Sequence, residues 1–396
     1  MTQPISVARA ATLGFSAFLV GIGIGRFGYP AIIPALVAEG WTTPFIAHVA
    51  AASNLAGYIL GALAGIALMR AFGPRATIIG ALWVTVASFL FSAVPLPGWL
   101  FAGMRFVSGV TGAVLMVAVA PMITASVDPA RRGRATGLAF SGIGCGIIAS
   151  GLLVPLLARF GLGAAWLGFG AVLAAASALA TAMLPRVIAA PAPSRDSEGA
   201  RRWSPALIGL ACVYASVAIG FVPHTVIFVD YVARVLGRGL DAGGLIWGVT
   251  GCGAIISPIL LGRLADRIGF APTMRLTFSA LVVGTVLAAS FDTLWILAVT
   301  AFIAGSVGVT SALVTVARLR ELVDADRQTT IWAQFTVVFG LGQSASAYAT
   351  SGLLAWTGNY PLLFILAGMV VVVGLVIEMA TAHRTGAEGP PRALNA

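Results

Sequence analysis

Arg26 and Arg105 lie inside apolar stretches of the sequence, where a charged side chain is uncommon. Arg26 is near the centre of the run at residues 10–38, and Arg105 is about two turns into the run at 99–124. If these runs cross a membrane, an arginine at mid-helix costs roughly 2.5–3.5 kcal/mol on insertion scales, so it usually serves a function. A guanidinium can hold a carboxylate through two parallel hydrogen bonds. We therefore predict that Arg26 binds an anionic group. For both arginines the structural alternative is a side chain that caps backbone carbonyls or forms an ion pair.

The thirteen acidic residues avoid the centres of the apolar runs. Nine fall in segments that we expect on the cytoplasmic side, and the rest fall at the outer ends of runs or in outer loops, at Glu39, Asp230, Asp241 and Asp292. Arg26 is therefore expected to have no resident counter-ion, and the cavity around it is expected to be net positive. Such a cavity suits a small carboxylate or a similar anion, whereas it suits a cationic drug or a polyamine poorly.

Aromatic and polar side chains recur at helical spacing in several runs, which predicts stripes that face a common cavity. Any single polar residue in such a stripe could instead make a hydrogen bond between helices. Together with Arg26, the residues predicted to bind substrate are Tyr29, Asn54, Tyr58, Phe221, Trp247, Trp332 and Gln343.

His224 and Asp230 are titratable residues in the second half of the chain that could serve proton coupling or gating. A histidine changes charge near neutral pH, and His224 is the best-placed titratable group in that half. Asp230, six residues farther along, is predicted to be a proton-entry acid or a partner in an outer gate. For His224 the alternative is a neutral histidine hydrogen-bonded to a neighbouring helix. His48 begins the run at 44–70, and we expect it at the membrane interface.

The elements that must position these residues are twelve apolar runs. The chain of 396 residues is 59% hydrophobic and 9% charged, whereas soluble proteins carry roughly 25% charged residues. One membrane-spanning helix needs about 20 apolar residues. The runs fall at 10–38, 44–70, 76–94, 99–124, 135–158, 163–184, 205–232, 243–262, 272–290, 294–317, 329–356 and 360–381. We therefore predict an all-α polytopic membrane protein with twelve transmembrane helices.

All 23 basic residues are arginines, and their placement predicts the orientation of the helices. Eighteen fall in alternate segments that include both chain ends, three fall in the opposite loops, and two lie within runs. Cytoplasmic loops carry the excess of positive charge, so we predict that both termini lie in the cytoplasm and that the protein resides in a bacterial inner membrane. The net charge of +10 is thus explained by arginines that flank helices in a lipid bilayer. This placement argues against nucleic acid as a partner.

The residue types that are absent exclude several classes of function. Without lysine there is no Schiff base for retinal or pyridoxal phosphate and no lysine of a nucleotide-binding loop. The three cysteines, Cys145, Cys212 and Cys252, all lie in apolar runs and have no metal-ligand spacing. We therefore expect no cofactor, no metal and no enzyme activity.

The two halves of the sequence resemble each other. Residues 191–204, in a stretch rich in proline, serine and charge, are predicted to form a cytoplasmic linker between bundles at 1–190 and 205–396. A shift of 196 residues places WLFAGMRFVSGVTG (99–112) over WILAVTAFIAGSVG (295–308) and also pairs Gly57 with Gly253 and Gly73 with Gly269. Two parallel six-helix repeats, with substrate bound between them near the midplane, are the expected arrangement.

Several motifs resemble those of the major facilitator superfamily, and the resemblance extends over essentially the whole chain. GRLADRIG (262–269) matches the superfamily's loop motif G-x-L-A-D-R-x-G, whereas the first-half stretch IALMRAFGPR (66–75) departs from it. The resemblance implies a conformational latch at Gly262, Asp266, Arg267 and Gly269. RFVSGVTGA (105–113) is similar to the motif whose arginine is linked to proton coupling, which implies that role for Arg105. GIGRFGYPAIIP (23–34) further resembles the YbfB/YjiJ-like bacterial group. Superfamily members are typically monomers, so a monomer is expected.

The sequence thus predicts a secondary active transporter that moves a small organic anion by alternating access, coupled to protons. A proton-driven exporter of small amphiphiles or drugs is an alternative, although Ile147 stands where the exporter motif of drug antiporters has proline. A membrane sensor or scaffold without transport is an alternative of another class.

Overall fold

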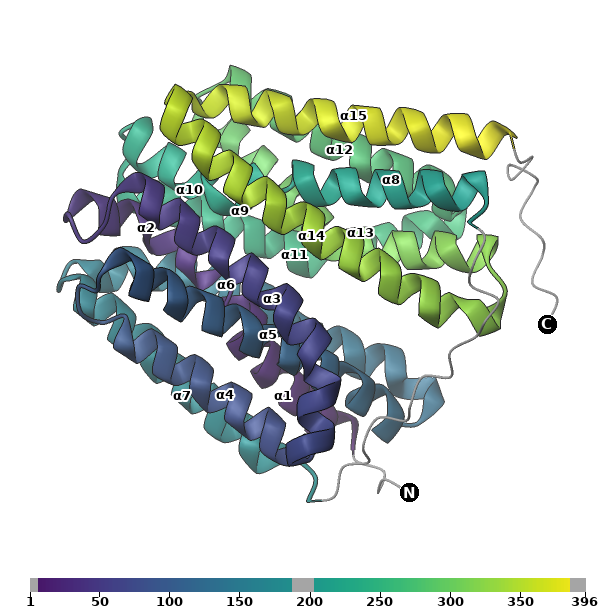
Figure 1. Cartoon of the computed structure of the whole chain (residues 1–396), viewed down its shortest axis with the longest axis horizontal. Helices are drawn as coiled ribbons and strands as arrows, with labels where there is room; N and C mark the ends of the chain where they lie inside the picture. The colour runs from purple at the N-terminus through teal and green to yellow at the C-terminus, as the bar shows by residue number, and fades with distance from the viewer. Residues whose placement is uncertain (1–5, 187–202, 385–396) are drawn as a thin grey trace.

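The computed structural model describes residues 6–186 and 203–384, which form membrane-length helices (Figure 1). The N-terminal half consists of α1 (Val7–Phe18), η1 (Leu19–Ile24), α2 (Gly28–Ala38), α3 (Pro44–Phe72), α4 (Pro74–Phe91), α5 (Gly98–Ser126), η2 (Pro129–Arg131), α6 (Arg132–Ala158) and α7 (Leu162–Met183). The C-terminal half consists of α8 (Pro205–Gly220), α9 (Val222–Val226), α10 (Phe228–Asp230), η3 (Tyr231–Val235), α11 (Gly239–Ile268), α12 (Phe270–Ser290), α13 (Leu294–Leu322), α14 (Ala325–Thr357) and α15 (Tyr360–Arg384). The described residues contain no strand, so the predicted all-α membrane fold is confirmed. The predicted linker lies almost entirely outside the described residues.

The helices run back and forth between two ends of the molecule (Figure 1). We call the end at which α1 begins and α15 finishes the terminal end, and the opposite end the distal end. Eleven helical segments of the described chain are long and apolar enough to cross a membrane, with α1, η1 and α2 forming one of them and α8 to η3 another. The remaining long helix, α14, has 33 residues but is more polar, and it packs against α3 of the other half. A helix that lies between the halves needs a less apolar surface than one that faces lipid.

Short-range signals explain where the helices begin and end. The hydroxyls of Ser6, Thr43 and Ser204 cap α1, α3 and α8 by accepting hydrogen bonds from backbone amides. Gly73 and Gly269, which the 196-residue shift relates, end α3 and α11 with φ angles of +80° and +87°. Only glycine adopts such angles without strain.

The structure repeats the same close contacts in both halves. Gly57 of α3 packs against the backbone of Phe106 in α5, and Gly253 of α11 packs against the backbone of Phe302 in α13. Likewise Gly109 packs against Asn54, and Gly305 packs against Thr250. All four pairs obey the 196-residue shift, so the predicted pseudo-repeat is present in the fold. Small residues at these positions allow the helix backbones to approach closely.

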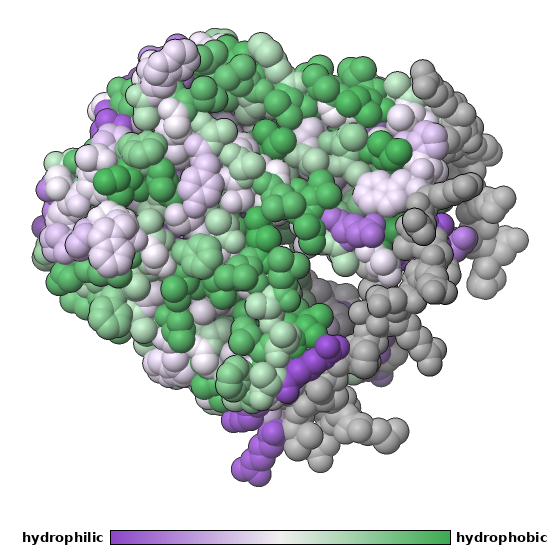
Figure 2. Space-filling model, in the orientation of Figure 1, coloured by the Kyte–Doolittle hydropathy of each residue, from purple (hydrophilic) through white to green (hydrophobic). Residues whose placement is uncertain are grey.

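The two halves meet along two pairs of helices, α6 with α11 and α3 with α14. Between α6 and α11, Gly144 and Gly151 face Gly251 and Gly244 so closely that a methyl group at any of them would collide with the opposite helix. The surface is mostly hydrophobic, and the molecule is hollowed between the halves toward the terminal end (Figure 2).

Candidate functional site

The first membrane span is interrupted at the position of Arg26. The π-helical turn η1 ends at Ile24, residues 25–27 form a turn, and α2 begins at Gly28. The first span of the second half is interrupted at the related position, because Phe221 separates α8 from α9 and corresponds to Gly25 under the 196-residue shift. Interrupted spans expose backbone groups that must find other partners, and in transporters they often surround the substrate.

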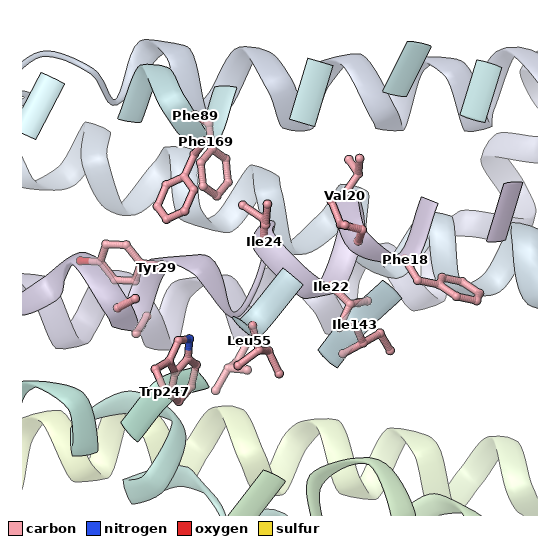
Figure 3. Close-up of a cluster of buried hydrophobic side chains, with 14 of the residues drawn as sticks. Phe18, Val20, Ile22, Ile24, Tyr29, Leu55, Phe89, Ile143, Phe169 and Trp247 are labelled. Atoms are coloured by element: carbon pink, nitrogen blue, oxygen red, sulfur yellow. The ribbon is translucent and has the colours of Figure 1, made fainter. Parts of the chain in front are cut away.

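Side chains from three helices satisfy the carbonyls at this interruption. The Gly25 carbonyl accepts hydrogen bonds from Asn54 Nδ2 at 3.3 Å and from Ser108 Oγ at 2.6 Å. The Phe27 carbonyl accepts a hydrogen bond of 2.8 Å from the indole Nε1 of Trp247, which is fully buried on α11. Trp247 therefore joins the two halves at the site, and Figure 3 shows it beside the first span.

Arg26 lies between the two halves without an acidic partner among the described residues. Its Nη2 donates a hydrogen bond of 2.5 Å to Oε1 of Gln343 on α14. Its guanidinium carbon lies 5.0 Å from the ring centre of Phe27 and 5.2 Å from that of Tyr58. The Nε atom is buried and has no hydrogen-bond partner in the described part of the chain. A guanidinium held by aromatic rings and one amide keeps hydrogen-bonding capacity for an anion.

A small cavity adjoins the guanidinium of Arg26. Its lining comes from both halves and consists of Arg26, Phe27, Pro30, Ala51, Asn54, Leu55, Thr225 and Val226. It has room for little more than one water molecule. A metabolite therefore cannot fit unless side chains or helices move, and the bond between Arg26 and Gln343 joins the two halves beside this cavity.

The predicted substrate-binding residues divide into two groups. Arg26 and Asn54 line the cavity. Tyr58 and Gln343 contact the Arg26 guanidinium, and Trp247 supports the backbone beside it. The other three lie elsewhere. Tyr29 is 1% exposed and donates its hydroxyl to the Ala47 carbonyl at 2.9 Å. Phe221 packs against Gly308 of α13, and Trp332 packs against Tyr214 with ring centres 5.6 Å apart.

Arg105 is fully buried inside the N-terminal half rather than at the contact between the halves. Its Nη2 donates hydrogen bonds to the Ser88 carbonyl at 3.0 Å and to Ser92 Oγ at 2.9 Å. Four aromatic rings surround its guanidinium carbon at 4.3–5.9 Å, and they belong to Tyr29, Phe89, Phe101 and Trp166. The Arg105 side chain thus caps a backbone carbonyl within a cage of aromatic rings. This is the capping arrangement that the sequence left open as the alternative to a functional role.

His224 is also buried among aromatic rings. Its ring centre lies 5.0 Å from those of Phe228 and Phe364. Neither ring nitrogen has a hydrogen-bond partner in the described residues. The alternative of a histidine bonded to a neighbouring helix therefore has no support in the described contacts.

Asp230 is the centre of a buried polar cluster near the distal end. Arg234 Nε and Nη2 donate to its two carboxylate oxygens at 2.9 and 2.8 Å, and the Tyr360 hydroxyl donates to Oδ2 at 2.5 Å. His48 Nε2 lies 3.4 Å from the same oxygen. Since His48 is on α3 and the other residues belong to the C-terminal half, this cluster bridges the halves. His48 is 1% exposed, so its side chain is enclosed by the protein.

Sequence reasoning missed three members of this cluster: His48, Arg234 and Tyr360. The spacing of Asp230 and Arg234, i and i+4 on a helical segment, was a usable signal for an ion pair. No comparable signal existed for His48 or Tyr360, because their proximity depends on how the two halves meet.

The motif residues at the end of α11 lie at the terminal end. Asp266 and Arg267 are exposed, and neither forms an ion pair or a side-chain hydrogen bond within the described residues. Gly269 ends the helix and Gly262 is open to a larger side chain. The latch expected of Asp266 and Arg267 is therefore not engaged in this conformation.

A helical membrane fold built from two repeats, with interrupted helices and an unpaired arginine between the halves, defines a secondary transporter. A family model described as the uncharacterised MFS-type transporter YbfB matches residues 18–379. The chain therefore belongs to the YbfB-like family of major facilitator superfamily transporters, whose members are not enzymes.

Solved structures of transporters share this fold. The chain is similar to a mutant of the nucleoside transporter NupG, with 12% identity, a TM-score of 0.72, and coverage of 95% of this chain and 99% of that chain. It is also similar to a bacterial homologue of the human lysosomal transporter Spinster in an inward-facing and occupied conformation. There the identity is 13%, the TM-score is 0.71, and coverage is 96% of this chain and 97% of that chain. No curated protein matches the chain. At these identities the likeness shows the fold alone.

Proposed function

We propose that this protein is a proton-coupled transporter of a small organic anion with a carboxylate-like group. The observation that carries the proposal is Arg26, placed at an interrupted span between the halves with no acidic partner in the described chain. A carboxylate could replace the Gln343 amide and take two parallel hydrogen bonds. Asn54, Tyr58 and Gln343 would complete the pocket. Tyr29, Phe221 and Trp332 would contribute only after a rearrangement.

The transport cycle follows from the same contacts. Residues 1–190 rock against residues 205–396, joined by the linker at 191–204, and the protein acts as a monomer in a bacterial inner membrane with both termini in the cytoplasm. The conformation described here is then closed at the distal, outer side by the cluster around Asp230. Asp266 and Arg267, exposed here, act as a latch when the terminal side closes. Arg105 and His224 serve proton coupling less directly, because both are enclosed by aromatic rings.

The test is thermal stabilisation of the purified protein by small metabolites at about pH 5.5 and about pH 7.5. A ligand at 100 times its Kd adds about 2.7 kcal/mol to the stability of the native state. We expect carboxylates to raise the melting temperature of the parent protein and not of Arg26→Gln. Arg26→Lys keeps the charge but loses the two-pronged geometry, so it should respond weakly. Arg70→Gln, an exposed arginine at the end of α3, is the matched control and should respond like the parent.

Other outcomes point to the alternatives. A carboxylate that stabilises Arg26→Gln as strongly as the parent would refute the anion site. Responses confined to cationic or neutral amphiphiles would favour an exporter, and responses to nucleosides would favour a substrate like that of NupG. A ligand that binds but shows no flux in liposomes would favour a sensor or scaffold.

A further inference from the structure

The buried cluster at the distal end contains a histidine that contacts the other half of the protein. That group is His48 of α3, whose Nε2 faces Oδ2 of Asp230 at 3.4 Å. Both side chains are 1% exposed or less. The contact joins the N-terminal half to the C-terminal half, so its strength affects how firmly the distal end stays closed.

The hydrogen bonds around Asp230 indicate which member of the cluster carries the exchangeable proton. Arg234 donates to both carboxylate oxygens, and Tyr360 donates to one of them. A carboxylate that accepts from all these donors acts in its ionised form, and arginine keeps its proton at any physiological pH. Tyr360 uses its proton in the bond to Asp230. His48 Nε2 has no hydrogen bond in the described residues, so a proton on its ring displaces no existing contact.

The other titratable and charged groups around α3 are engaged elsewhere. Tyr29 of α2 donates to the Ala47 carbonyl, and Arg105 of α5 is enclosed in its aromatic cage. On α14, Tyr348 lies 3.1 Å from Ser53 Oγ, one turn beyond His48. On α9, His224 packs against aromatic rings. Asp230 is thus the acidic group that the imidazole of His48 contacts in the described structure.

We propose that His48 takes up a proton from solution and that the imidazolium closes the distal end by pairing with Asp230. When the proton leaves, the ring is neutral, the charge-assisted contact becomes an ordinary polar one, and the distal end opens more readily. The inference rests on the alternating access of the proposed function but not on the identity of the substrate. It makes His48 the group that links proton concentration to closure of the distal end, separately from the coupling role proposed above for Arg105 and His224.

The test is a distance measurement between spin labels at the distal end, made without any substrate. Labels at Phe160→Cys and Trp356→Cys, with the three native cysteines replaced by serine, report on opposite halves at side chains that are 79% and 85% exposed. In the parent the short distance should dominate at about pH 5.5. The ratio of short to long distances should fall about tenfold by about pH 8.5, as expected when a charge-assisted contact becomes neutral. His48→Gln, which stays neutral, should show the long distance at both pH values.

Three further variants keep the result decisive. His224→Gln should retain the pH dependence of the parent. Asp230→Asn removes the negative charge that faces His48 without changing His48 itself. It should lose that dependence, so it supplies a second test if His48→Gln does not fold. A His48→Gln or Asp230→Asn protein with the pH dependence of the parent would overturn the proposal, as would a parent distance that does not change with pH. Arg26→Gln should keep the pH response, which separates failure of the anion site from failure of this switch.

Discussion

Replacing Gly109 by alanine should damage both the stability of the protein and its binding site. Gly109 of α5 packs under α3, where a methyl group would lie 2.8 Å from the carbonyl carbon of Asn54 and 3.0 Å from the backbone nitrogen of Tyr58. Non-bonded carbon atoms keep about 3.5–4.0 Å apart. The two helices would therefore have to separate by roughly an ångström, because backbone atoms cannot rotate aside as a side chain can.

The expected magnitude follows from two opposing effects. Overpacking of this kind costs about 1–3 kcal/mol, and a backbone clash belongs at the upper end of that range. Replacing glycine by alanine in a helix stabilises the folded state by about 1 kcal/mol, because alanine has the higher helix propensity. The net loss is about 2 kcal/mol, which lowers the melting temperature of a large domain by roughly 4–8 °C. The same movement shifts the Asn54 amide away from the Gly25 carbonyl, so stabilisation by a bound ligand should also fall.

The measurement is a melting curve of the purified protein with and without ligand. Gly103→Ala is the matched control, since it lies on the same helix and a methyl group there meets nothing within 4 Å. Its melting temperature should be unchanged or slightly higher. Equal melting temperatures for the two variants would refute the packing argument, and a destabilised Gly109→Ala that still binds ligand normally would refute its link to the site.

Two further predictions concern the contacts that cross between the halves at the site. Gln343→Glu supplies the arginine of the first span with a resident carboxylate, so anion affinity should fall about tenfold or more. Gln343→Ala removes a neutral pocket residue and should weaken binding much less. Ligand titrations of both variants decide the matter, and equal affinities would contradict the proposed anion site. Trp247→Phe removes the indole donor at the interrupted span and leaves space where the larger ring packed, so it should cost more than the ~1 kcal/mol of the hydrogen bond alone. Melting curves beside Trp295→Phe, a tryptophan that is 69% exposed, test this, and equal effects would show that the hydrogen bond contributes nothing.

The fold could be predicted from the sequence because the apolar runs are long and uniform. The predicted run at 99–124 corresponds to α5 at Gly98–Ser126, and the run at 44–70 corresponds to α3 at Pro44–Phe72. The requirement that every backbone group in a membrane be satisfied within the protein leaves helices as the simplest solution for such runs. Glycines repeated at a shift of 196 residues likewise marked close helix contacts in both halves.

The site could be predicted only in part, because the first span of each half is not one regular helix. Arg26 stood out by its charge, but Tyr29 was assigned to the same face on the assumption of unbroken helical spacing. The turn at 25–27 changes that phase, and Tyr29 points into the N-terminal half instead (Figure 3). Phe221 was likewise assigned to a helical face on the assumption of an unbroken helix, but it lies at the interruption between α8 and α9. Contacts such as that of His48 with Asp230 depend on the closure of one half against the other, which local patterns do not encode.

The glycine contacts between α6 and α11 have a consequence for how fast the protein can change shape. Where Gly144 and Gly151 face Gly251 and Gly244, main-chain atoms of the two helices come close together, with the side chains of Ile148, Pro155 and Ile255 packed beside them. Since glycine has no side chain to interlock, a small rotation of one helix over the other has only these few side chains to displace. Friction at this contact is low, so the rate of interconversion should be governed by the polar contacts at the distal end.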